Sequence, residues 1–213
     1  FSVTFFNQDI GSWDVSNVEQ FDNMFVSCDI TSLDVSNWNV SNAVNLYAFV
    51  QGCDLLTTLD VSNWDVGNCS NFKLMFTGCP LLNPDVSNWD TSKVTNFNNM
   101  FVNADAFNAD ISSWDTSSLL QTYRMFKGAD VFNSDIGGWN VSIVNNMEEM
   151  FQNASAFNQD LTCWDVDPAP SNTNFSTGSP LNSLTLFSTS ETIILFHFHL
   201  LNQVLNVNWF FYF

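Results

Sequence analysis

The chain has 213 residues, with 22 Asp and Glu against 4 Lys and Arg, and a formal net charge of −18 at pH 7. Four scattered cations do not build a surface that neutralises phosphates, so neither nucleic acid nor an anionic membrane surface is an expected partner. Because 46% of the residues are hydrophobic and 15% are aromatic, the chain carries enough apolar surface to fold, unlike a disordered acidic tail.

Tryptophan recurs at nearly constant intervals of 25 or 26 residues along most of the chain. A period of roughly 20–50 residues is typical of proteins built from stacked repeats. We therefore predict a partial repeat over residues 1–12, six repeats and the start of a seventh over residues 13–166, and a non-repeat tail over residues 167–213. The Trp residues that set this frame are Trp13, Trp38, Trp64, Trp89, Trp114, Trp139 and Trp164.

Each repeat is expected to contain a short strand just before its Trp residue. An aliphatic residue stands three positions before every Trp and follows an Asp, and aliphatic residues of this kind favour strands. The pairs are Asp9-Ile10, Asp34-Val35, Asp60-Val61, Asp85-Val86, Asp110-Ile111, Asp135-Ile136 and Asp160-Leu161.

After each Trp, the sequence predicts a polar corner and then a helical or 3₁₀ segment. Ser16 followed by Glu19 has the spacing of a capping box. Apolar residues then recur in steps of three and four, as in the run from Val94 to Phe101, which is a helical spacing. The expected fold class is therefore an α/β repeat solenoid with one short strand and one helical or 3₁₀ segment per coil. The same N-cap position is taken by Ser41, Ser92, Ser117 and Ser142.

The Trp column is interpreted as a structural ladder, because no single repeat can bury its own apolar residues and aromatic rings dominate buried area. The alternative is a row of exposed indoles that binds sugar rings. Three Cys residues, Cys28, Cys53 and Cys79, stand where other repeats have Ala. We therefore predict small buried side chains with reduced thiols, while a disulfide between neighbouring coils stays open as an alternative.

Two columns of acidic residues flank the Trp column, one four positions before each Trp and one directly after it, where Asn39 and Asn140 replace Asp in two repeats. The favoured interpretation is that each Asp accepts hydrogen bonds from the backbone of its own turn. A row of calcium sites is the second interpretation, since calcium prefers carboxylate oxygens. A paired-carboxylate hydrolytic site is the third, and the identical environments of the repeated acids argue against it. The calcium candidates are Asp9, Asp34, Asp60, Asp85, Asp110, Asp135 and Asp160.

The repeat unit W-D-V-S-N-V, followed by M-F-x-x-A and F-N-x-D-I, resembles the BspA-like leucine-rich-repeat family, whose 25-residue unit is also known from mycoplasma surface lipoproteins. The resemblance covers about residues 5–166. It implies a leucine-rich-repeat-like solenoid at the cell surface or in the extracellular space, which serves adhesion or protein binding. No catalytic residue and no cofactor follow from it, and surface display rests on the resemblance alone because no signal peptide is recognised in the sequence.

A non-enzymatic module that binds an extracellular protein or glycan is therefore the expected function, and a carbohydrate-binding or calcium-dependent surface module is the alternative. The two His residues, His197 and His199, lie in the tail, which leaves no histidine inside the repeats. The tail ends in an apolar run from Ile193 to Phe213, interpreted as a cap or a disordered segment rather than a membrane span. The binding surface is expected at positions that vary between repeats, namely Glu19, Lys73, Lys93, Arg124, Lys127 and Glu148.

Overall fold

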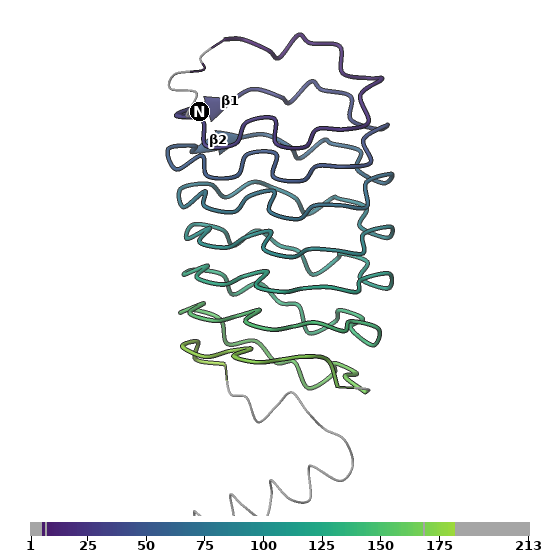
Figure 1. Ribbon diagram of the computed structural model, residues 1–213, viewed down its shortest axis with the longest axis vertical. Coiled ribbons are helices and arrows are strands. Elements are labelled where there is room, and N and C mark those ends of the chain that lie inside the picture. The colour runs from purple at the N-terminus through teal and green to yellow at the C-terminus, as the bar shows by residue number, and fades with distance from the viewer. Residues whose placement is uncertain (1–5, 7, 168, 182–213) are drawn as a thin grey trace, which may run out of the picture.

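The computed structural model describes residues 6, 8–167 and 169–181. The chain winds into a stack of flat coils, one per sequence repeat, along the long axis of the molecule (Figure 1). Two short strands, β1 (Ser32–Leu33) and β2 (Thr58–Leu59), pair in parallel in the first coils. A column of single parallel bridges joins all the coils, and its partners are one repeat apart: Gln20, Asn45, Asn71, Asn96, Gln121, Asn146 and Ser171.

The predicted α/β class is wrong, because the described residues contain no helix and no strands besides β1 and β2. Where a helical or 3₁₀ segment was predicted, alternate N–H groups point along the stack axis to carbonyl oxygens of the next coil. An α-helix would use these groups internally. In one coil the bonds run from Phe97 to Gln121 (3.0 Å), Asn99 to Tyr123 (2.8 Å), Phe101 to Met125 (2.9 Å) and Asn103 to Lys127 (2.9 Å).

The backbone alternates because two residues per coil, four positions apart, adopt a left-handed conformation with positive φ. Asn99 and Asn103, at φ 59° and 53°, are one such pair. The intervening N–H groups close tight turns, as when Met100 donates to the Phe97 carbonyl at 3.1 Å. The turn repeats every four residues, so apolar side chains point inward with the same steps of three and four that a helix would give. The predicted apolar spacing is therefore correct, but tight turns rather than a helix produce it.

The predicted strand and N-cap positions are also wrong. β1 ends one residue before Asp34, so the Asp34-Val35 pair follows the strand. None of the seven pairs lies in a strand, and each directly precedes a turn. No helix begins after Ser16. Its amide and hydroxyl instead donate to the Asp14 carboxylate at 3.1 and 2.6 Å, closing a turn. Ser and Asp at this spacing form a local hydrogen-bonded turn as readily as a helix cap.

The Trp ladder forms one wall of the core, as predicted, in six of the seven positions. Trp38 to Trp164 are only 3–6% exposed, whereas Trp13 in the first coil is 49% exposed. Trp114 lies between its neighbours with ring centroids 6.4 and 6.2 Å away. A row of exposed indoles, which the sugar-binding alternative requires, is therefore not present. Each buried indole N–H donates to a carbonyl of the preceding coil, at Ile10, Val35, Val61, Val86, Ile111 and Ile136.

The cysteines are free thiols, and all but Cys163 are buried, in agreement with the interpretation as small core residues. Burial raises the pKa of Cys53 to about 12. Its Sγ lies 2.9 Å from the Phe25 carbonyl oxygen, which it contacts as a donor. The four buried thiols therefore stay protonated and unreactive at neutral pH.

The stack extends through Leu181, because Ser171 bridges to Asn146 and Phe175 is buried beneath Phe151. The predicted non-repeat tail, a cap or a disordered segment, covers residues 167–213, and its residues 182–213, with His197 and His199, lie outside the described residues. Within the part that the structure describes, no helix is long and apolar enough to cross a membrane.

Candidate functional site

Both acidic columns form Asx turns, in which Oδ1 accepts the amide N–H two residues on, and this confirms the favoured interpretation. The seven bonds of the first column, from Asp9 to Asp160, are 2.9–3.1 Å long. In the second column the bonds are 2.9–3.3 Å long, and Asn39 and Asn140 make them as Asp does. The repeated acids thus hold the turns of the coil.

The calcium candidates therefore each commit one carboxylate oxygen to their own turn. The described residues contain no group of three or more His, Cys, Asp or Glu side chains that could hold a metal ion. Asp9 and Asp34 lie in successive coils, both within 3.5 Å of the position that a Cβ on Gly11 would take. The carboxylates of Asp9 and Asp34 are thus close neighbours along their column.

We expect the Asx turns to make stability depend on acid. Hydrogen bonds from the Ser36 hydroxyl and amide lower the pKa of Asp34, and Ser87 does the same for Asp85. A carboxyl whose pKa is lower in the folded state contributes stability above the unfolded value of about 3.9, and that stability is lost as pH falls through the folded pKa. Asn in these positions keeps the turn without titrating.

The measurement is thermal unfolding of the wild type and of an Asp34→Asn/Asp85→Asn variant at pH 7 and pH 3. The variant should match the wild type at pH 7 and lose less Tm on acidification. The variant lacks only two of the negative charges that give the wild type its net charge of −18 at pH 7, so most of the effect of the overall charge is common to both proteins. An equal loss in both would show that these turns do not sense acid.

A second surface carries the variation between repeats. We call it the turn face: the side chains of residues 20–27, 45–52, 71–78, 96–103, 121–128 and 146–153 that reach the surface, most of which, including Leu74, Arg124 and Glu149, are half-buried. Its backbone is the same in every coil, and the second positive-φ position is always Ser, Asn or Gly. The first positive-φ position instead varies widely: Asn23, Ala48, Leu74, Asn99, Arg124, Glu149 and Asn174.

Leu74, Arg124 and Glu149 are unusual at such positions. Asn and Gly tolerate the left-handed conformation, whereas other residues lose about 1–2 kcal/mol in it. Their φ values of 63°, 56° and 55° match those of the Asn residues in the same column. Backbone geometry therefore does not explain why these residue types occur here. Residues held in an unfavourable backbone conformation are frequent at functional sites.

Arg124 and Glu149 stack in successive coils and form the centre of a charged cluster on the turn face. Arg124 makes two hydrogen bonds to the Glu149 carboxylate, at 2.8 and 3.0 Å, and Lys127 makes a third at 2.6 Å. These bonds lower the pKa of Glu149 to about 2. The Arg124 guanidinium also lies 4.6 Å from the centre of the Tyr123 ring. Charge, an aromatic ring and hydrogen-bonding groups are thus fixed at one place.

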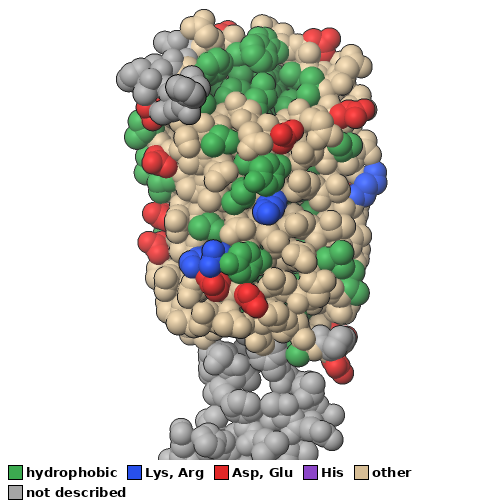
Figure 2. Space-filling view, in the orientation of Figure 1, with side chains coloured by type: hydrophobic (Ala, Val, Ile, Leu, Met, Phe, Trp, Pro, Cys, Tyr) green, Lys and Arg blue, Asp and Glu red, His purple; other side chains and the backbone are tan. Residues whose placement is uncertain are grey.

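The structure brings some of the predicted variable positions together and separates others. Lys73, Arg124, Lys127 and Glu148 lie on the turn face, and Figure 2 shows the Lys and Arg side chains on the viewed side and at its right edge. Lys93 lies elsewhere in its coil and donates to Asn68 at 2.7 Å. Sequence reasoning missed Leu74 and Glu149, although residues one repeat apart, such as Arg124 and Glu149, could have been paired from the period alone.

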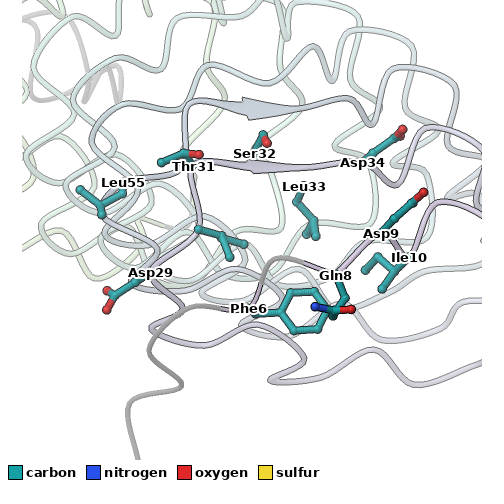
Figure 3. Close-up of a pocket in the computed structure, with 11 residues that line it drawn as sticks. Phe6, Gln8, Asp9, Ile10, Asp29, Thr31, Ser32, Leu33, Asp34 and Leu55 are labelled. Carbon is teal, nitrogen blue, oxygen red and sulfur yellow. The ribbon is translucent and has the colours of Figure 1, made fainter.

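A groove of about 570 Å³ opens at the N-terminal end of the stack, between Phe6, residues 8–10 and β1 (Figure 3). Its floor includes Ile30 and Leu33, and no Lys or Arg lines it. Asp29 and the half-exposed Leu55 lie together at one end. The groove is therefore lined by a mixture of apolar and polar side chains, and its charged residues, Asp9, Asp29 and Asp34, are all acidic.

One family model matches the chain. Its description is "Mycoplasma protein of unknown function, DUF285", and it matches residues 1–94 and 70–184. No curated protein and no solved structure matches. The two family matches together span well over half of the sequence and cover every repeat. The chain therefore belongs to the family described as Mycoplasma protein of unknown function, DUF285.

Proposed function

We propose that this chain is a non-enzymatic repeat module, displayed on the cell surface or secreted, that binds an extracellular protein through the turn face. The resemblance of its repeat to the BspA-like leucine-rich-repeat surface proteins supports the location and the adhesive role. Repeat proteins commonly bind partners with side chains that differ between otherwise identical units.

The observation that carries the proposal is the column of first positive-φ positions. At Leu74, Arg124 and Glu149 the column carries side chains that disfavour the positive φ of the position. Beside them stand Tyr123 and Lys73, and Tyr and Arg are the residue types that dominate binding energy at protein interfaces. Binding by a few such residues on a rigid stack needs no catalytic group and no cofactor.

The test separates binding from folding. Leu74→Asn should raise the free energy of unfolding by up to about 1 kcal/mol, because Asn accepts positive φ better than Leu. The same change should weaken binding, since the apolar side chain at the centre of the face is lost. Chemical denaturation measures the first effect, and titration with the bound partner measures the second.

The partner is sought by screening the full chain against glycans and extracellular proteins, in calcium and again in chelator. Asn23→Gly is the matched control, because it changes the same column two coils away at a residue suited to positive φ. Protein binding that Leu74→Asn weakens and Asn23→Gly does not is the expected result. Glycan binding that requires calcium, and is untouched by Leu74→Asn, would replace this proposal with the alternative module.

A further inference from the structure

A stripe of apolar and acidic side chains runs along a different edge of the stack, at the corner that precedes β1 and β2 in the first coils. Leu55, Leu81 and Val131 occupy equivalent positions and are 49%, 52% and 47% exposed. Ala106 and Ala156 continue the column in two further coils, whereas Ile30 and Leu181, at its two ends, are buried. An acid precedes the apolar position in four coils. We call this surface the corner stripe: Leu55, Leu81, Ala106, Val131 and Ala156 with Asp29, Asp54, Asp105 and Asp130.

The corner stripe continues into the groove beside β1. Leu55 and Asp29 belong to both and lie together at the end of the groove in Figure 3. In Figure 2, apolar and acidic side chains gather along the left edge of the molecule. Large apolar side chains exposed in one row, rather than singly, mark a surface that another molecule covers.

The charges of the corner stripe are unbalanced. Asp105 and Asp130 lie in successive coils, and the pKa of Asp105 is raised by partial burial and by the negative charge of Asp130. The described ion pairs of the chain join Arg124 and Lys127 to Glu149 on the turn face. A partner with positive charge beside its apolar residues would relieve this repulsion.

At three of the five apolar positions of the corner stripe the amide N–H is already hydrogen bonded within the stack, which favours a partner that satisfies its own backbone. Amide N–H groups of the apolar column donate to carbonyls of the preceding coil: Ala106 to Pro80 (3.0 Å), Val131 to Asp105 (3.3 Å) and Ala156 to Asp130 (3.0 Å). An added β-strand would find these donors occupied. A helix satisfies its own backbone, and its pitch of about 5.4 Å is close to the spacing of about 4.8 Å between parallel-bridged coils.

We propose that the corner stripe is a docking surface for an amphipathic α-helix whose apolar face is bordered by Lys or Arg. Successive turns of the helix lie against successive coils, with Leu-like side chains on Leu55, Leu81 and Val131 and cations over the neighbouring carboxylates. The inference rests on the proposed role in protein binding and names the chemical class of partner, but it uses a surface separate from the turn face.

The probe is a labelled synthetic peptide of about 18 residues, or five helical turns, made of Leu and Lys with Leu at helical spacing. Its reference is a peptide of the same composition with the spacing scrambled. Fluorescence anisotropy with the full chain should show tighter binding of the amphipathic peptide. A Leu81→Ser/Val131→Ser variant should weaken that binding about tenfold, because apolar area is lost from the contact.

The matched control is Leu120→Ser/Ile143→Ser, which removes side chains of 38% and 48% exposure outside the corner stripe. It should leave the affinity unchanged, as should Leu74→Asn on the turn face. Asp54→Asn/Asp130→Asn should weaken binding and reduce its dependence on salt. Equal binding of the two peptides, or equal effects of the two double variants, would overturn the inference. Loss of partner binding with Leu74→Asn, seen alongside such a failure, would leave the proposed function standing.

Discussion

Trp114→Ala should lower the free energy of unfolding by about 3–5 kcal/mol, the range for removal of a large aromatic side chain from a core. The indole is 3% exposed and its N–H donates to the Val86 carbonyl at 3.0 Å. Its ring is covered on both sides by Trp89 and Trp139. Because coils stabilise only their neighbours, a cavity here weakens the contacts on both sides. Urea denaturation measures the loss.

Trp13→Ala is the control within the same column. Trp13 is 49% exposed, and among the described rings it stacks on Trp38, with centroids 6.3 Å apart. Less apolar surface returns to water when it is removed, so the loss should be less than half that of Trp114→Ala. Similar losses for the two variants would mean that the ladder is not the main support of the stack.

The period and the core could be predicted from the sequence because both depend on composition at fixed intervals. A Trp every 25 residues places one indole in each coil, independent of the local backbone conformation. The indoles are buried because the coils stack on one another. The Asx turns could be predicted as well, since Asp34 and Ser36 stand two residues apart and make a purely local contact. Neither inference needed the path of the chain between these points.

The path itself was mispredicted because two conformations share one apolar spacing. A helix and a ribbon of tight turns with a left-handed residue every fourth position both bury residues in steps of three and four. One signal did distinguish them. Gly52, Gly78 and Gly128 fall inside the predicted helical segments, and Gly disfavours a helix interior by about 1 kcal/mol. A Gly that recurs at the same position of several repeats indicates a residue with positive φ at that position.

The turn face could be predicted only in part. Lys73 and Arg124 stood out because they differ from their counterparts in other repeats. That Leu74 and Glu149 occupy left-handed positions is invisible without backbone angles, and the argument for function depends on those angles. The corner stripe was missed for a related reason: no sequence pattern marks Leu55 and Val131 as surface residues, and only the structure shows them exposed.

Gly128→Ala should destabilise the stack, whereas Gly138→Ala ten residues away should not. Gly128 has φ +67°, and a Cβ there would lie 2.5 Å from the Asn103 side-chain oxygen of the preceding coil. We expect a loss of about 1–2 kcal/mol from the left-handed conformation alone, and the contact with Asn103 adds to it. At Gly138 nothing lies within 4 Å of the added Cβ. Ala there should stabilise by about 0.4–1 kcal/mol through the unfolded chain.

Gly128→Asn separates the two causes of the loss. Asn accepts positive φ, as Asn153 does at 60° in the equivalent position of the next coil, so only the contact with Asn103 remains. Its free energy of unfolding should fall between those of the wild type and Gly128→Ala. Chemical denaturation of the three variants measures the order. A Gly128→Asn variant as unstable as Gly128→Ala would assign the whole loss to crowding between coils. A lower free energy of unfolding for Gly128→Ala together with a higher one for Gly138→Ala would confirm that tight turns, not a helix, set the backbone conformation.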